Sequence, residues 1–311
     1  MRGTQSFIIM KRLFLLLTVV GVLFTARATA QTNNIQFKEG KIKQFCTLRW
    51  DTNSDYELSY DEAAAVTNLD YAFKGKDISM FNELKYFTGL KSIERFEFKD
   101  CISLSSIIIP NSVISIGETA FAGCTSLTDI VIPDSVTKIG KEAFARCSSL
   151  ASVTIGNSVT SIEAKAFYGC TSLKEVYYTG DLSAWCKINI GHFGSPLNAE
   201  AKLYINDTEQ TDITIPSDIT AIKDFAFFTC ASLKSVTIPA SVTSIGANAF
   251  SYCKGLTKVY FKSTTPPTIH PQAFNGNAPG RKIYVPRSSV EAYKSATGWS
   301  MYAKDIEGYD F

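Results

Sequence analysis

The sequence predicts an α+β repeat solenoid, in which about eight rungs of 23 residues build a parallel β-sheet between a helical N-terminal cap and a mixed C-terminal cap. Three observations predict it. Six cysteines keep a 23-residue spacing apart from one longer interval, a phenylalanine and a leucine flank each of them at fixed distances, and an alternating apolar segment follows each one. The 45% hydrophobic content supplies the core that stacked rungs bury between them.

Residues 1–30 have the pattern of a secretory signal peptide. Lys11 and Arg12 precede an unbroken apolar run, LFLLLTVVGVLF, and a small-residue segment, Ala-Thr-Ala, ends at residue 30. The run is about 12 residues, shorter than the roughly 20 that a membrane-crossing helix needs, and this disfavours the alternative of a membrane anchor. We therefore expect cleavage before Gln31, no transmembrane span in the mature chain, and a secreted or cell-surface location.

Residues 31–77 are expected to form a helix–loop–helix cap around a calcium loop. The segment DTNSDYELSYDE, residues 51–62, carries oxygen ligands at positions 1, 3, 5, 7, 9 and 12 of a twelve-residue loop. It resembles an EF-hand or dockerin-type loop, which implies a structural Ca²⁺ that fixes the cap. The predicted ligands are the side chains of Asp51, Asn53, Asp55, Ser59 and Glu62, together with the carbonyl of Glu57.

One position departs from the calcium-loop pattern. Position 6 is normally glycine because the backbone turns sharply there, and this loop has Tyr56 instead. The chain also has no second loop to pair with this one. The alternative interpretation is a capping box, in which Ser59 is the N-cap and Glu62 the N3 residue of an ordinary helix.

The repeats are predicted over residues 78–262. The cysteine column is Cys101, Cys124, Cys147, Cys170, Cys230 and Cys253, with a phenylalanine three residues before each and a leucine three residues after each. Apolar residues six and eight positions after each cysteine alternate as in a short strand, and proline ends several of these strands. A second apolar pair follows. Weaker rungs are expected at 78–98, with Phe81, Leu84, Tyr86, Leu90 and Ile93 in the repeat columns, and at 213–222.

The repeat TSLTDIVIPDSVTKIGKEAFARC resembles the BspA-like leucine-rich repeats of bacterial surface proteins, and the resemblance covers residues 78–286. It implies a leucine-rich-repeat fold. It also implies a role like that of related adhesins, which bind host matrix proteins or other cells.

The cysteine column is predicted to be a ladder of buried thiols. Equivalent Cβ atoms in neighbouring rungs would lie near the ~4.8 Å strand spacing, whereas a disulfide needs ~3.8 Å. Disulfides remain the alternative for an exported protein. Cys46 and Cys186 lie off the column, and their redox state is left open.

The repeat register slips by 14 residues in an insertion near 180–206, which contains Trp185, His192 and Phe193 and a probable strand at 202–205. The cap at 263–311 is expected to contain a last strand at 283–286 and a short helix opened by Ser288 and Glu291. Trp299 and Tyr302 are expected to cover the final rung.

The ligand surface is predicted on the outward side of the strands. Its members are Val131, Thr154, Tyr177, Thr214, Thr237 and Tyr260, with Trp185 added from the insertion. Aromatic side chains on a repeat scaffold are good anchors for a partner, and the surface suggests a protein ligand rather than a deep pocket.

No enzyme is predicted. The only two histidines, His192 and His270, are far apart in the chain, and no catalytic motif surrounds them. Residues 31–311 carry 27 basic and 29 acidic side chains without a basic block, so nucleic acid is not an expected partner. We therefore expect an exported binding or adhesion protein for an extracellular protein or cell-surface ligand. The alternatives are a glycan-binding accessory protein of a nutrient-uptake system and, less favoured, an enzyme with an unrecognised site.

Overall fold

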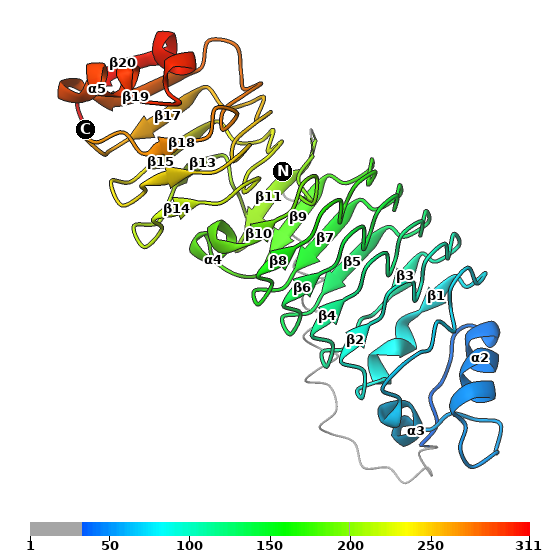
Figure 1. Ribbon diagram of the computed structural model, residues 1–311. Helices are drawn as coiled ribbons and strands as arrows, with labels where there is room; N and C mark the ends of the chain where they lie inside the picture. The colour runs from blue at the N-terminus through cyan, green and yellow to red at the C-terminus, as the bar shows by residue number, and fades with distance from the viewer. Residues whose placement is uncertain (1–32, 199) are drawn as a thin grey trace, which may run out of the picture. The chain divides into compact units, whose positions relative to one another are not determined.

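Strands of two to five residues stack side by side in two ladders that run through the repeats (Figure 1). The computed structural model describes residues 33–198 and 200–311, and residues 34–311 form one compact unit. The predicted signal peptide lies outside the described residues. None of the helices within the described ranges is long and apolar enough to cross a membrane.

The first ladder contains the longer strands. Four parallel strands and one antiparallel edge strand form its N-terminal sheet: β5 (Asp129–Ile132), β7 (Ser152–Ile155), β9 (Glu175–Tyr178), β11 (Lys202–Ile205) and β12 (Thr208–Glu209). Five parallel strands form its C-terminal sheet: β13 (Asp212–Thr214), β15 (Ser235–Ile238), β17 (Lys258–Phe261), β19 (Lys282–Pro286) and β20 (Ile306–Tyr309). A separate pair, β1 (Met80–Phe81) and β3 (Ser106–Ile107), precedes them.

The second ladder is built from the second apolar leg of each repeat. Its N-terminal sheet contains β2 (Ser92–Ile93), β4 (Ser115–Ile116), β6 (Lys138–Ile139), β8 (Ser161–Ile162) and β10 (Asn189–Ile190). Its C-terminal sheet contains β14 (Ala221–Ile222), β16 (Ser244–Ile245) and β18 (Thr268–Ile269). The predicted parallel pairing and the 23-residue register are confirmed, because Ser115 pairs with Lys138 and Lys138 with Ser161.

The core consists of identical side chains stacked from rung to rung. The rings of Phe98, Phe121, Phe144 and Phe167 lie nearly parallel, with centroids 5.1–5.2 Å apart. All eight cysteines are buried free thiols, so the predicted thiol ladder is confirmed. The Sγ atoms of five of the six column cysteines donate hydrogen bonds to phenylalanine carbonyls earlier in the stack, as Cys124 does to Phe98 at 3.0 Å. The exception is Cys230, whose Sγ lies 3.6 Å from Ser232 Oγ.

The N-terminal cap contains α2 (Gly40–Trp50), α3 (Tyr60–Ala65) and a 3-10 helix, η1 (Asn82–Tyr86). Ile42 and Cys46 of α2 are buried, and Trp50 packs against Phe87 with ring centroids 5.4 Å apart. The predicted register of the first rung is wrong at Phe81. The 23-residue spacing aligned Phe81 with Leu104, but Phe81 pairs with Ile107, because η1 lengthens this rung by three residues.

The C-terminal cap contains η2 (Arg287–Ser289), α5 (Val290–Ser295) and η3 (Ser300–Asp305). Trp299 and Tyr302 are buried, as predicted. The predicted opening of the last helix by Ser288 and Glu291 is wrong. The helix α5 begins at Val290 after a 3-10 turn, and no side chain caps its first amides. The sequence also gave no signal for β20, which adds a strand beside β19.

Candidate functional site

The outward side of the first ladder carries the predicted ligand surface. Along each strand the burial alternates, so that one residue faces the core and the next faces solvent. Val131, Thr154 and Tyr177 occupy equivalent outward positions in the N-terminal sheet, and Thr214, Thr237 and Tyr260 do so in the C-terminal sheet. All six side chains are exposed or half-buried, as their position in the repeat predicts.

A stacked tyrosine pair ends the N-terminal sheet. Tyr177 of β9 and Tyr204 of β11 lie opposite each other, with ring centroids 4.9 Å apart and planes 22° apart. The Tyr177 hydroxyl donates to Glu175 Oε2 at 3.0 Å. Partial burial, followed by this bond to Glu175, raises the pKa of Tyr177, so its hydroxyl stays protonated at neutral pH. The pair is a fixed, neutral aromatic surface with a polar rim.

A larger aromatic cluster occupies the same side of the C-terminal sheet. Tyr260 stacks on Tyr284 at 4.9 Å, and Tyr309 approaches both rings at 5.4 and 5.5 Å. Phe311 lies 5.1 Å from Tyr309 and is 55% exposed. We call Tyr260, Tyr284, Tyr309 and Phe311 the C-terminal aromatic cluster. It is the main concentration of aromatic side chains on this face.

Sequence reasoning found one member of each group and missed the others. Tyr204 and Tyr284 stand in the two segments that were expected to be strands, at the outward position of KLYI and IYV. Period-two alternation applied to those segments would have found both. Tyr309 is the last residue of an unpredicted strand and Phe311 follows it, so no signal in the sequence placed them here.

The assignment of Trp185 to the ligand surface is wrong. Trp185 lies in α4 (Leu182–Lys187) and is fully buried, with its ring 5.4 Å from Tyr178. Its indole Nε1 donates to the carbonyl of Ala226 at 3.0 Å. The side chain fills the interior where the insertion interrupts the stack. Because the ring is buried and its N–H is already bonded, Trp185 has no surface or donor free to contact a ligand.

Exposed aromatic rings also line the turns at the insertion. His192, Phe193, Phe225 and Phe228 form a chain of ring contacts, which begins with His192 and Phe193 at 4.1 Å and continues from His192 to Phe225 at 5.8 Å. Phe193 is 44% exposed. We call these four residues the turn aromatic row. Two come from the insertion and two from the rung that follows it, and they meet only in the folded chain.

The twelve-residue loop lies between α2 and α3, as predicted. Asp51 accepts hydrogen bonds from the amides of Ser54 at 2.7 Å and Tyr56 at 2.8 Å. Tyr56 has φ 63°, the left-handed conformation that this loop position requires, and its side chain is 82% exposed. The backbone thus adopts the turn without glycine, because the bulky ring points into solvent.

Glu62 fastens the two ends of this loop. Its Oε1 accepts from the Thr52 amide at 2.7 Å, and its Oε2 accepts from the Ser59 amide at 2.9 Å. Ser59 Oγ accepts in turn from the Glu62 amide, so the capping box is present. These bonds, led by that from the Ser59 amide, lower the pKa of Glu62 to about 2. The carboxylate is therefore ionised at any physiological pH.

A backbone bridge supports the loop from outside. The amide of Ile35 donates to the carbonyl of Leu58 at 2.8 Å, and Asn34 pairs with Ser59 in antiparallel fashion. Leu58 is fully buried. Over residues 33–198 and 200–311, no three His, Cys, Asp or Glu side chains gather closely enough to form a metal site. The carboxylates of the loop instead accept backbone N–H groups.

Stacked rungs with a strand, a turn and a second apolar leg define a leucine-rich-repeat solenoid. The family described as "BspA type Leucine rich repeat region" matches residues 69–188 and 199–298 in six copies. These residues make up more than half of the chain, and the protein belongs to this family.

Solved structures of similar proteins come from several bacteria. A leucine rich cell surface protein from Faecalibacterium prausnitzii is 23% identical, with 72% of this chain and 78% of that chain covered and a TM-score of 0.34. A leucine-rich repeat protein from Bacteroides ovatus is 21% identical, with 83% and 89% covered and a TM-score of 0.31. The leucine-rich repeat protein of T. pallidum is 26% identical, with 55% and 77% covered and a TM-score of 0.38. No curated protein matches the chain.

Proposed function

We propose that this protein is an exported, non-enzymatic binding protein, which presents the outward side of its first ladder to a protein ligand at the cell surface. The single observation that carries the proposal is the C-terminal aromatic cluster, in which two exposed and two half-buried aromatic side chains contact one another on the outward side of the sheet. Aromatic residues are the side chains most enriched at the centres of protein interfaces. Membership of a repeat family supports a binding role, because stacked repeats create extended surfaces.

The way the tyrosines stack favours a protein over a glycan. Sugar rings bind against the open face of an aromatic ring. In the pairs Tyr177–Tyr204 and Tyr260–Tyr284 each ring covers one face of the other at 4.9 Å, which leaves fewer open faces for a sugar. Ring edges and hydroxyl groups are also available for contact, and these suit the mixed polar and apolar surface of a protein.

Surface plasmon resonance of residues 31–311 against matrix proteins, mucin and polysaccharides tests the proposal. We expect saturable binding to a protein, and we expect Tyr260→Ala or Tyr284→Ala to weaken it about tenfold or more, as central aromatic contacts do. Tyr168→Ala removes an exposed tyrosine of a turn, away from the outward side of the first ladder, and is the matched control. Binding only to polysaccharides would replace this function with that of a glycan-binding accessory protein.

The proposed cofactor is a structural Ca²⁺ in the loop 51–62. The left-handed backbone at Tyr56 and the helices on both sides support it, because they supply the geometry of a twelve-residue calcium loop. The ligands would be those expected from the sequence, with the Glu57 carbonyl at position 7. The Glu57 side chain is held by Lys43 and is not needed. Glu62 would have to exchange its bonds to Thr52 for the ion.

Calorimetric titration with Ca²⁺ and melting in excess Ca²⁺ or chelator test this cofactor. We expect binding and a higher melting temperature with Ca²⁺, and loss of both in Asp51→Asn, which weakens a ligand at the first loop position. Glu291→Gln removes an exposed carboxylate far along the chain and is the control. Identical melting in calcium and chelator would leave Glu62 with its capping role alone.

A further inference from the structure

The second ladder is interrupted between β10 and β14. In regular rungs, the amide after the buried isoleucine donates to the isoleucine carbonyl of the preceding rung. These bonds join Gly117 to Ile93, Gly140 to Ile116, Glu163 to Ile139 and Gly191 to Ile162, at 2.8–2.9 Å, and they resume from Gly246 to Ile222 at 2.9 Å. The corresponding bond from Lys223 to Ile190 is missing. In the described part of the chain β10 pairs only with β8, and β14 only with β16.

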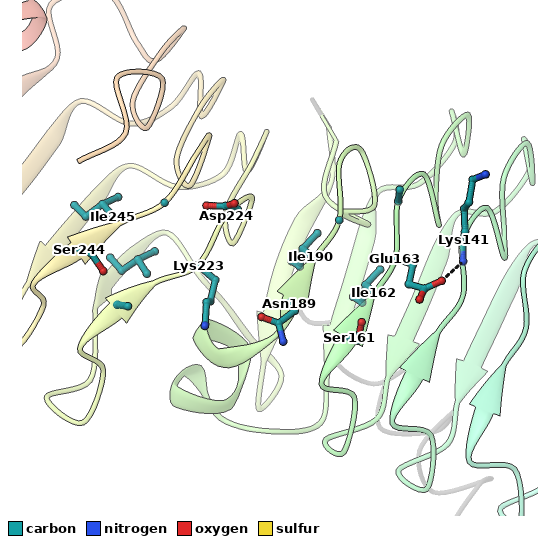
Figure 2. Close-up of a pocket in the computed structure, with 15 residues that line it drawn as sticks. Lys141, Ser161, Ile162, Glu163, Asn189, Ile190, Lys223, Asp224, Ser244 and Ile245 are labelled. Carbon is teal, nitrogen blue, oxygen red and sulfur yellow. Dashed lines mark hydrogen bonds between the residues drawn. The ribbon is translucent and has the colours of Figure 1, made fainter. Parts of the chain in front are cut away.

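A cavity of about 820 Å³ lies at this interruption, lined by residues of β8, β10, β14 and β16. Figure 2 shows Asn189 and Ile190 on one side of it, and Lys223 and Asp224 on the other, with no strand between them. The Ile190 carbonyl and the Lys223 amide are therefore the edges of two sheets that face a common groove. An open strand edge of this kind is a template for pairing with another chain.

Side-chain contacts join the two sides of the interruption. At one end, Lys187 Nζ of α4 pairs with Asp218 Oδ2 at 2.7 Å. At the other end, His192 and Phe225 of the turn aromatic row are in ring contact at 5.8 Å. The two halves of the ladder thus meet around the groove, but their backbones do not pair across it.

Two lysines, Lys141 and Lys223, and two carboxylates, Glu163 and Asp224, border the groove. Glu163 is satisfied by Lys138 Nζ at 2.7 Å and by the Lys141 amide at 3.0 Å. Asp224 accepts from the Ala247 amide at 2.6 Å. Neither Lys223 nor Asp224 makes an ion pair with a residue that the structure describes, and the lysine ammonium is the cation left for an acidic partner. An occupant with an acidic side chain beside Lys223 would supply the missing partner.

We propose that an extended segment of another polypeptide binds in this groove as an added strand between β10 and β14. Its backbone accepts from the Lys223 amide and donates to the strand carbonyls of β10, as a regular rung does. An acidic side chain of the segment pairs with Lys223, and an apolar one contacts the turn aromatic row. This site is on the second ladder and does not depend on the proposed function of the first.

The probe is a labelled nine-residue peptide that copies residues 157–165, NSVTSIEAK. In the folded protein this segment contains β8, which is hydrogen-bonded on both edges and carries Glu163 after its isoleucine. A second peptide replaces that isoleucine by alanine, in case Trp185 leaves room only for a small inward side chain. We expect saturable binding of at least one peptide by fluorescence anisotropy, together with slower hydrogen exchange of the Lys223 amide. Absence of binding by both peptides, or binding without this protection, would overturn the proposal.

Two variants locate the contact. Ala221→Trp fills the groove and is expected to weaken peptide binding about tenfold or more, while Ser115→Trp makes the same change at the equivalent place of a regular rung and should have no effect. Lys223→Glu is expected to weaken binding about three- to tenfold, and the exposed Lys174→Glu should not. Melting curves check that each variant is folded. Wild-type affinity in Ala221→Trp contradicts the site, whereas Tyr260→Ala affects only the function proposed for the first ladder.

Discussion

The two ends of the repeat stack are covered in different ways. At the N-terminal end, two glutamates are buried beneath the cap. Glu83 accepts from the Lys38 amide at 3.1 Å and Glu97 from the Tyr71 amide at 3.2 Å, and the second oxygen of each carboxyl has no hydrogen-bond partner. At the C-terminal end, Trp299 packs against Tyr293 at 4.8 Å and Phe261 at 5.0 Å. Aromatic rings are buried at both ends, but among the described residues the buried glutamates lie at the N-terminal end.

The position of Glu97 shows what this difference means. Every later rung has alanine at the equivalent position, immediately before the core phenylalanine: Ala120, Ala143, Ala166, Ala226, Ala249 and Ala273. At the first rung the carboxyl group of Glu97 takes the place of the alanine methyl group and reaches the N-terminal cap. Burial raises the pKa of Glu97 to about 7. The N-terminal end should therefore respond to pH near neutrality, whereas the aromatic end should not.

The largest expected effect comes from removing the Trp299 side chain at the C-terminal end. Trp299→Ala should lower the free energy of unfolding by about 3–5 kcal/mol, because it empties a fully buried site and leaves the Pro267 carbonyl without its indole donor. The nearby Met301→Ala, at a side chain that is 52% exposed, should cost less than about 0.5 kcal/mol. Urea unfolding measures both. Equal stability of the two variants would contradict the role of Trp299 as the cover of the last rung.

The next largest effect is expected at the N-terminal end of the stack, where Glu97 is buried. Because folding raises the Glu97 pKa from an ordinary value near 4.5 to about 7, the folded state binds the proton more tightly than the unfolded state. Between these pH values stability should fall as pH rises, by about 3 kcal/mol in all. Glu97→Gln stays neutral, so it should remove this slope and exceed the wild type in stability at pH 8.

Melting curves of both proteins at pH 5, 6, 7 and 8 check this prediction. Glu142→Gln, at a half-buried position of a later rung, is the matched control and should follow the wild type. Parallel pH profiles of the wild type and Glu97→Gln would show that Glu97 does not titrate in this range.

The repeats could be predicted from sequence because each core position recurs in six copies of the repeat. A column such as Phe98, Phe121 and Phe144 fixes the stacking direction, since equivalent side chains must meet in neighbouring rungs. The ends and the insertion occur once each, so no second copy corrects an error. Trp185 is the clearest case: a lone tryptophan in an insertion looks like an exposed anchor, but in the fold it fills the gap that the insertion itself creates.

The candidate sites were predictable to a different degree. The outward column followed from period-two alternation, which places Tyr177 and Tyr260 without any knowledge of the ligand. The groove between β10 and β14 could not be predicted. It depends on a hydrogen bond that is missing between residues 33 positions apart, and the sequence shows only that the register slips there.

A smaller effect is expected in the ladder between the two ends. Cys147→Ser places a hydroxyl in a fully buried apolar position and should cost about 1–2 kcal/mol by urea unfolding. Burial raises the pKa of the Cys101 and Cys230 thiols to about 11, so these thiols should not react with a thiol reagent at pH 8 in the folded protein. Denaturation without reductant should release all eight thiols, and seven in Cys147→Ser. Recovery of fewer than half would refute the thiol ladder.

The smallest effect lies in the loop of the N-terminal cap, and its sign is opposite to that of Glu97. The bond from the Ser59 amide, with those from Thr52, lowers the pKa of Glu62 to about 2, so its contribution is present above about pH 4.5 and is lost as pH falls toward 2. Because the loop is open to solvent, the loss should stay below about 1 kcal/mol. Glu62→Gln should therefore reduce stability slightly at pH 6 and flatten only the acid side of the profile, while Glu97→Gln flattens only the alkaline side. The two glutamates together make the N-terminal cap most stable at mildly acidic pH, and hydrogen exchange of α3 across pH 3–8 measures that maximum. If the protection of the α3 amides, corrected for the rise of intrinsic exchange with pH, instead increased steadily toward pH 8, Glu97 would not govern this end of the stack.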